Sequence, residues 1–322
     1  MSSRAVVVFG VSLLLVGLAM GSLGAVQADW ASPKATMKAS PSPSRDQPPT
    51  PAAVPSPMPT PTPAVYDHVV TIVLENHSFE SVVGSPQAPY LNSFANSWSL
   101  ATGYSGVSHP SLPNYLAIIG GSTFGIASDC TNCFLNAPSL PDRLEAAGKT
   151  WKGYMEGMPA PCFTGSSGLY AQKHNPFAYF DPIRNDPARC SQVVPYSRLA
   201  ADFASAATAP NFAFVTPNLC NDGHDCTLGT TDAWLSKEVP DLMSSSAFAN
   251  SRSLLVITYD EGEGGSERVA TILAGSGVRR GFQSTATYNH YSLLRTIESL
   301  WALAPLADGD GAASPMTDFF TS

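Results

Sequence analysis

Positively charged residues are scarce in this sequence, and they form no cluster. Residues 65–322 hold 13 Lys and Arg against 23 Asp and Glu, a formal net charge of −10 for this part of the chain. Proteins that bind nucleic acid need a basic patch to neutralise phosphates. The scarcity therefore argues against a nucleic-acid partner. An anionic substrate would have to be attracted locally, by a metal ion, by helix N-termini or by a few placed cations.

Several common catalytic motifs are also absent. The chain has no Gly-x-Ser-x-Gly nucleophile elbow, no Walker A loop, no His-Glu-x-x-His and no Gly-x-Gly-x-x-Gly. These patterns mark α/β-hydrolases, P-loop nucleotide-binding proteins, zinc proteases and dinucleotide-binding domains. Any chemistry must come from a different set of residues.

Residues 1–28 have the pattern of a secretory signal peptide. Arg4 precedes an apolar stretch over residues 5–20, and Val26-Gln27-Ala28 is a small-residue cleavage site. The apolar stretch is short for a membrane-spanning helix. We therefore expect a secreted or extracytoplasmic protein, and an uncleaved membrane anchor is the alternative.

Residues 29–64 have the composition of a linker. Eleven of the 28 prolines lie here, mixed with Ser, Thr and Ala. Such a segment cannot bury a core and favours extended polyproline II. We expect it to tether one folded domain, residues 65–322, whose length suits a single α/β domain.

Six cysteines accompany the export signal, and an even number in an oxidising compartment predicts disulfides. Six cysteines allow 15 pairings. A zinc site at Cys130-x-x-Cys133 is the alternative, although a second close pair is missing. Our expectation is sequential pairing: Cys130–Cys133, Cys162–Cys190 and Cys220–Cys226.

Strand-like and helix-like segments alternate along the folded part, which predicts an α/β fold with a mainly parallel central sheet and helices on both faces. The expected strands are 68–74, 150–155, 211–217, 253–260 and 268–275. The expected helices are 113–121, 140–149, 231–245 and 290–303.

Polar residues follow three of these strands directly, and ligands of open α/β sheets bind at the carboxyl ends of strands. Glu75 and Asn76 follow the first strand, and Asp260 and Glu261 follow the fourth. Hard carboxylate and amide oxygens favour Ca²⁺, Mg²⁺ or Mn²⁺ over zinc. We predict a metal site from these four residues. The alternative is ordinary turn and helix-cap chemistry.

Ser111 lies in Ser-His-Pro-Ser-Leu-Pro-Asn, at the start of an expected helix. Pro113 suits a first helical turn, which places Ser111 at or just outside the N-cap. Ser111 could be a plain cap. It could also be a nucleophile, because a helix N-terminus stabilises both a phosphate and a developing alkoxide. His109, two residues earlier, could carry a proton or bind phosphate.

Four further polar residues have candidate roles in the loops. His224 follows the third strand and His290 opens the last helix, and we predict that both are functional. Lys173 and His174 occur together in a loop, where binding and structural roles remain equally open.

Taken together, these segments resemble the motifs of the phosphoesterase family, in the expected order over residues 66–304. That family includes secreted bacterial acid phosphatases, phosphatidylinositol-phosphate phosphatases and non-specific phospholipases C, and has an alkaline-phosphatase-like fold. The matching segments are Glu75-Asn76-His77-Ser78-Phe79, His109-Pro110-Ser111-x-Pro113-Asn114-Tyr115, Asn221-Asp222-x-His224-Asp225, Asp260-Glu261-Gly262 and His290-Tyr291-Ser292.

The resemblance implies a metal-assisted hydrolase of phosphoric esters that forms a phosphoserine intermediate on Ser111. It implies that His224, Asp225 and His290 serve phosphate binding and proton transfer. The metal ligands that it implies are Glu75, Asn76, Asp260 and Glu261. Asn114, beside the nucleophile in the same motif, is expected to bind substrate with Lys173 and His174.

Two departures favour the compact acid phosphatases over the phospholipases: Tyr115 stands where that branch has Arg, and no long C-terminal domain follows. Expected substrates are small phosphoesters or phosphoinositide and phospholipid headgroups. A membrane is expected to be met only through such a lipid or an uncleaved anchor. The alternatives are a phospholipase C-type phosphodiesterase and a tethered extracellular binding module without catalysis.

Overall fold

The computed structural model describes residues 65–321 of the chain. The signal peptide predicted for residues 1–28 and the linker predicted for residues 29–64 lie outside the described residues. Within the described part, no helix is both long and apolar enough to cross a membrane.

An eight-stranded sheet forms the centre of the fold, and β8 alone runs against the other seven strands. This confirms the predicted mainly parallel sheet. A separate parallel pair joins β3 (Tyr104–Ser105) to β10 (Tyr288–Asn289). The strands of the large sheet, in spatial order, are β5 (Val193–Pro195), β4 (Trp151–Met155), β6 (Phe212–Thr216), β1 (His68–Leu74), β7 (Ser253–Tyr259), β8 (Thr271–Gly275), β2 (Ser99–Ala101) and β9 (Phe282–Ser284).

Strands β1 and β7 are the buried centre of this sheet. All seven residues of each strand are buried, and they pair in register from His68 opposite Ser253 to Leu74 opposite Tyr259. Parallel strands covered on both faces need continuous apolar runs, and both sequences supply them. Each buried Val, Leu or Ile side chain contributes about 1.5–3 kcal/mol, so this centre is a rigid base for the residues that follow it.

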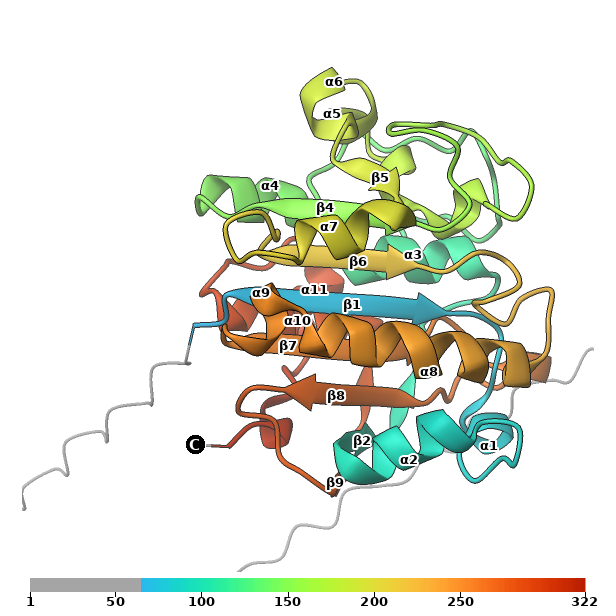
Figure 1. Ribbon diagram of the computed structural model, residues 1–322. Helices are drawn as coiled ribbons and strands as arrows, with labels where there is room; N and C mark the ends of the chain where they lie inside the picture. Colours follow the sequence, from blue (N-terminus) through green and yellow to red (C-terminus); the bar gives the residue numbers. More distant parts are fainter. Residues whose placement is uncertain (1–64, 322) are drawn as a thin grey trace, which may run out of the picture. The chain divides into compact units, whose positions relative to one another are not determined.

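Helices cover both faces of the sheet, as predicted. In Figure 1, α7 to α9 lie on the near face, and α3, α10 and α11 lie behind β6, β1 and β7. The helices are α1 (Phe79–Val82), α2 (Pro89–Ser97), α3 (Ser111–Gly120), α4 (Leu140–Ala146), α5 (Asp181–Arg184), α6 (Pro187–Cys190), α7 (Leu199–Asp202), α8 (Leu228–Ser244), α9 (Ser246–Ala249), α10 (His290–Leu300) and α11 (Asp308–Ala312).

Three disulfides close loops of the fold, with the sequential pairing that the sequence predicts. All six cysteines lie within residues 65–321, and none of them is free. The zinc alternative for Cys130 and Cys133 is therefore wrong, because both sulfur atoms are used in one disulfide.

Candidate active site

The carboxyl ends of three neighbouring strands bring buried carboxylates together. Glu75 follows β1, Asp260 follows β7, and Asp222 lies in the loop after β6; none of the three is exposed to solvent. The Glu75 N–H donates to the carbonyl oxygen of Asp222 (2.9 Å), and the Asn76 N–H donates to Asp260 Oδ1 (3.2 Å). The backbone thus holds the three strand ends in contact at one edge of the sheet.

Ser111 reaches this cluster from a different direction. It is the first residue of α3, and its hydroxyl donates to Glu75 Oε2 over 2.9 Å. The N-cap is Pro110, so the expectation that Ser111 lies at or outside the cap is off by one residue. The helix can include Ser111 because Pro113, which has no N–H, then occupies a first-turn position that needs no intrahelical donor. Ser111 therefore does not cap its own helix.

His174 bridges two of the carboxylates. Its Nε2 lies 3.1 Å from Glu75 Oε1, and its Nδ1 lies 3.3 Å from Asp222 Oδ2. The ring stacks on Tyr115, with centroids 5.2 Å apart. Burial lowers the pKa of His174 well below its usual value. The sequence motifs contain Asp222 and Tyr115, but neither residue was predicted as part of the site.

Burial strongly disfavours negative charge in this cluster. It raises the pKa of Glu75 and Asp260 well above the usual range, and neighbouring carboxylates raise both further. Burial also raises the pKa of Asp222 and of Glu261, each to about 7. Asp260 Oδ2 is buried and has no hydrogen-bond partner. A buried carboxylate oxygen without a donor is expected to face a cation when the group is ionised.

The residues fit a divalent cation. Side-chain ligand atoms of Glu75, His174 and His224 all lie within 4.8 Å of one another, and Asp260 Oδ2 is unpartnered nearby in the same cluster. The group of three shares Glu75 with the predicted set and adds two imidazoles, and Asp260 is a second predicted ligand in the same cluster. Asn76 has a left-handed backbone (φ 55°) that turns the chain sharply between Glu75 and His77.

A chain of polar contacts extends from the cluster toward solvent. Lys173 Nζ donates to Asp129 Oδ2 (2.8 Å) and lies 3.1 Å from His224 Nε2, and His224 Nδ1 lies 2.7 Å from Asp225 Oδ1. Burial lowers the pKa of Lys173, but Asp129 and nearby carboxylates raise it by a larger amount. The pKa of Lys173 therefore lies above its usual value, and the ammonium form is favoured. The structure thus brings Lys173, His224 and Asp225 together. Asp129 was not predicted as part of the site, because it lies in no recognisable motif and directly precedes Cys130.

A second group surrounds Glu261. His109 Nδ1 lies 2.9 Å from Glu261 Oε2, and His109 Nε2 lies 3.1 Å from Glu267 Oε1. Asn114 is fully buried: its Oδ1 accepts from the N–H groups of residues 107 and 108, and its Nδ2 donates to Glu261 Oε2 (3.3 Å). Asn114 therefore fixes the loop before Ser111.

His290 lies beneath the site and is completely buried. Its Nδ1 is 3.0 Å from the Tyr104 hydroxyl, and its Nε2 is 2.5 Å from the carbonyl oxygen of Asp260. Burial lowers the pKa of His290 to about 4. Both ring nitrogens are occupied, so this geometry supports the end of β7.

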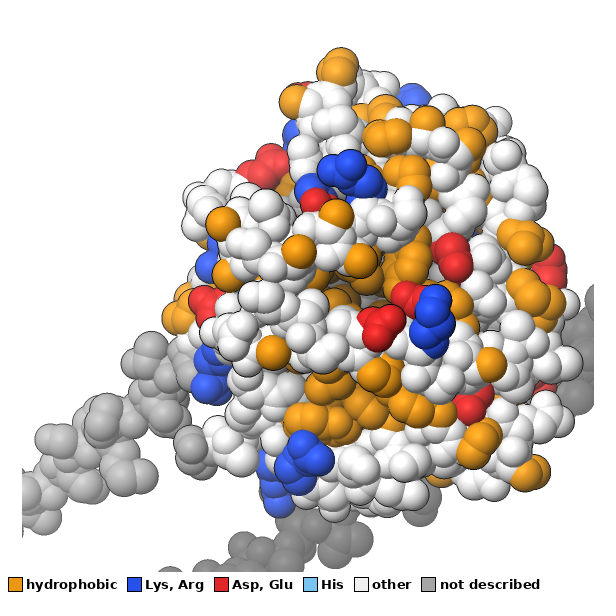
Figure 2. All heavy atoms as spheres, viewed as in Figure 1, with side chains coloured by type: hydrophobic (Ala, Val, Ile, Leu, Met, Phe, Trp, Pro, Cys, Tyr) orange, Lys and Arg blue, Asp and Glu red, His pale blue; other side chains and the backbone are white. Residues whose placement is uncertain are grey.

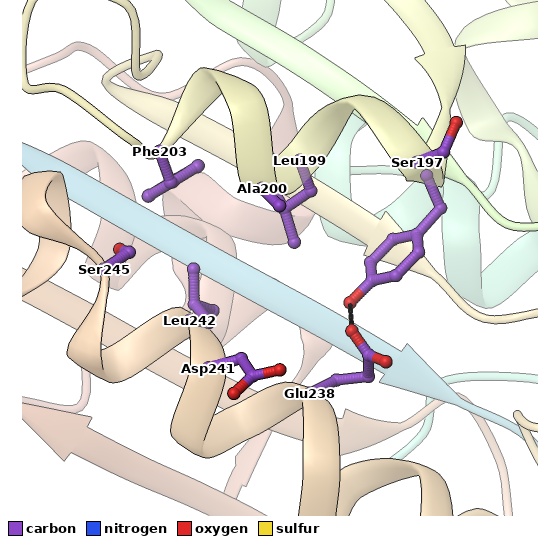
Figure 3. A pocket seen from close by; sticks show the side chains of 9 residues that line it. Ser197, Leu199, Ala200, Phe203, Glu238, Asp241, Leu242 and Ser245 are labelled. Atoms are coloured by element: carbon purple, nitrogen blue, oxygen red, sulfur yellow. Dashed lines mark hydrogen bonds between the residues drawn. The ribbon is translucent and has the colours of Figure 1, made fainter.

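A separate cleft of about 260 Å³ lies between α7 and α8 and contains none of the predicted site residues. Figure 2 shows apolar side chains in a hollow on this face of the molecule. Leu199, Phe203 and Leu242 point into the cleft, and Glu238 accepts from the Tyr196 hydroxyl (2.7 Å) at one end (Figure 3). The candidate chemistry therefore lies at the carboxyl edge of the sheet, apart from this cleft.

The fold and the position of the site define the structural class. A solved structure of a protein in the alkaline phosphatase superfamily from Vibrio parahaemolyticus aligns with a TM-score of 0.54 at 12% identity. The alignment covers 77% of this chain and 69% of that one. The predicted alkaline-phosphatase-like fold is confirmed.

The sequence places the chain within that class. The model of the Phosphoesterase family matches residues 85–304, and the chain belongs to this family. This confirms the predicted enzyme class, a hydrolase of phosphoric esters.

Two curated relatives extend the match. The phosphatidylinositol-3-phosphatase of Mycobacterium tuberculosis is 36% identical over 79% of this chain and 83% of its own length. The phosphate-repressible acid phosphatase of Penicillium chrysogenum is 31% identical over 77% of this chain and 62% of its own length, so the chain spans less than two thirds of that fungal relative.

Proposed function

We propose that this protein is a secreted acid phosphatase that hydrolyses phosphate monoesters through a phosphoserine on Ser111. The observation that carries the proposal is the buried contact between Ser111 Oγ and Glu75 Oε2, at the start of a helix and in a cluster of carboxyl groups where Asp260 Oδ2 has no hydrogen-bond partner. A helix cap does not need such a contact. A serine that attacks phosphorus must lose its proton, and it therefore needs a nearby acceptor such as Glu75 Oε2.

The residues around Ser111 supply the parts of a phosphoryl transfer. A divalent cation held by the predicted ligands Glu75, Asn76, Asp260 and Glu261, with His174 beside Glu75, would supply positive charge for the phosphoryl oxygens and the serine oxygen. Ser111 Oγ attacks phosphorus in line with the leaving alcohol, and its proton is directed toward Glu75. Most of the rate acceleration comes from positioning and charge neutralisation, as in phosphoryl transfer generally.

We assign the role of proton donor to the leaving alcohol to His224. Asp225 holds its Nδ1, and the Lys173 ammonium beside its Nε2 can supply the proton that the imidazole passes to the alcohol. A water molecule then attacks the phosphoserine, with an imidazole as base. We assign phosphate binding to Lys173. His290 and Asn114 position the loops that carry the reacting groups.

The substrate class follows from the relatives. Acid phosphatases and a phosphatidylinositol-3-phosphatase all match most of this chain, so a small phosphate monoester or a phosphoinositide headgroup is the proposed substrate. A membrane would then be met through the lipid substrate. The three disulfides support a location outside the cytoplasm.

Hydrolysis of three chromogenic substrates tests this function. We expect p-nitrophenyl phosphate to be hydrolysed at least ~10²-fold faster than bis-p-nitrophenyl phosphate or p-nitrophenyl phosphocholine, because one charge-stabilising contact fitted to a monoester changes rates on that scale. The Ser111→Ala protein is the matched control for contaminating phosphatases. Faster hydrolysis of either diester would replace the proposal with the phospholipase C-type alternative. Hydrolysis of none would favour the binding module.

A further inference from the structure

Asp129 connects α3, the helix that begins with Ser111, to the ammonium group of Lys173. It lies in the loop between α3 and α4, and its Oδ1 accepts from the N–H of Leu112, the residue after the nucleophile, over 3.0 Å. Its Oδ2 accepts from Lys173 Nζ over 2.8 Å. One carboxylate therefore fixes both the start of α3 and the position of the ammonium group.

This arrangement changes what α3 can offer to a phosphate. Pro113 has no N–H, and the Leu112 N–H is already occupied by Asp129. The ordinary anion site of a helix N-terminus is thus largely filled by a protein carboxylate. Among the Lys and Arg side chains of residues 65–321, Lys173 is the one in hydrogen-bond contact with a predicted catalytic residue, His224. Apart from the proposed metal ion, attraction of a phosphoryl group then depends on where the Lys173 ammonium is held.

The loop that carries Asp129 is fixed independently of this salt bridge. The Cys130–Cys133 disulfide closes it immediately after Asp129, and Gln172 Nε2 donates to the carbonyl oxygen of Thr131 over 3.0 Å. Gln172 and Lys173 belong to the same short 3-10 helix, η1 (Gln172–His174). Two contacts therefore join the loop to η1, and Asp129 is the contact that orients the ammonium group.

We propose that Asp129 is a positioning residue that holds the Lys173 ammonium beside His224 and so favours monoesters, which carry two negative charges above their second pKa of about 6, over diesters, which carry one. This inference rests on the proposed phosphatase function. Asp129 does not touch the substrate in this account. It acts through Lys173, whose ammonium binds the second charge of the phosphoryl group.

A double-mutant cycle tests the proposal, with Asp129→Asn, Lys173→Met and the double variant of the full chain. Binding of inorganic phosphate to the metal-loaded protein is measured by calorimetry, and kcat/KM is measured for the monoester and the diester.

Loss of a charge-assisted hydrogen bond should make Lys173→Met bind phosphate about 10-fold more weakly and lower the monoester-to-diester ratio by a similar factor. Asp129→Asn should weaken phosphate binding about 5-fold on the same scale, and this effect should vanish in the Lys173→Met background. The control is Asp142→Asn, which removes a different salt-bridged carboxylate, the partner of Arg189. It should change neither the phosphate affinity nor the monoester-to-diester ratio.

Two results would overturn the proposal. If Asp129 acted only through its own charge, Asp129→Asn would tighten phosphate binding, because a repelling anion would be gone. If Asp129 only stabilised its loop, the two substitutions would have independent effects and the monoester-to-diester ratio would not change. Phosphate binding is read without turnover, so an active Ser111→Ala protein would refute the phosphoserine while leaving this test valid.

Discussion

Binding of a divalent cation should expel protons from this protein, and the expected number follows from the buried carboxylates. Burial raises the pKa of Glu75 and Asp260 well above the usual range, and that of Glu261 to about 7. The raised pKa values favour the protonated form of all three groups in the metal-free protein, and Glu261, with its pKa of about 7, changes from mostly protonated at pH 6 to mostly ionised at pH 8. Metal ligation requires the ionised forms. Binding through these three residues should therefore release protons, and about one more at pH 6 than at pH 8, where Glu261 is already ionised.

Titration calorimetry measures this number directly. Mn²⁺ is added to chelated protein in two buffers of different ionisation enthalpy, at pH 6 and at pH 8, and the difference in heat gives the protons released. Glu261→Gln should release about one proton fewer at pH 6 and the same number at pH 8. Glu263→Gln, on the exposed neighbouring turn, is the matched control and should behave as wild type. Binding without proton release at pH 6 would show that the carboxylates are already ionised, and absence of binding would refute the metal role.

Three further predictions concern single residues and the disulfides. Ser111→Gly should lower turnover by at least ~10⁴-fold, as for loss of other serine nucleophiles, with little change in the urea midpoint because Ser111 is not a cap; near-wild-type activity would make water the attacking group. Burial raises the pKa of Glu298 to about 8 from an ordinary 4.5, so its contribution to stability is complete below pH 4.5 and is lost as pH rises toward 8. Glu298→Gln should remove up to about 5 kcal/mol of that pH dependence, measured by urea unfolding. Equal slopes of unfolding free energy against pH for the variant and the wild type would contradict this. Thiol titration of the unfolded, unreduced protein should find no free thiol, and two free thiols would contradict the disulfide pairs.

The sheet was predictable from the sequence because its central strands are buried on both faces. β1 and β7 require unbroken apolar runs, and these runs have the observed bounds to within one residue. The antiparallel direction of β8 was not predictable, because its apolar run looks the same in either direction. Strands β2, β5 and β9 of the large sheet were missed because three residues give too short a pattern.

The site was partly predictable because strand ends place their residues at one edge. Glu75, Ser111 and Asp260 come together as the sequence suggested, since their positions follow from the elements that carry them. Asp129 could not be found in this way. It is distant in sequence from Lys173 and Leu112, and its contacts exist only through the tertiary packing of the loop after α3.

The function of His290 shows the same limit. Its place at the start of α10 suggested chemistry, but a histidine that opens a helix can point either into a site or beneath it. The structure places both ring nitrogens against Tyr104 and the Asp260 carbonyl, which is a matter of side-chain packing and not of sequence position.

The central claim is that Ser111 carries the phosphoryl group during turnover. Wild-type protein and Ser111→Ala are mixed with p-nitrophenyl phosphate and quenched in acid during steady turnover, and their proteolytic fragments are sequenced by tandem mass spectrometry. We expect phosphate on Ser111 in the wild type and on no serine in the variant. Full turnover with an unmodified Ser111 in every quenched sample would contradict the account.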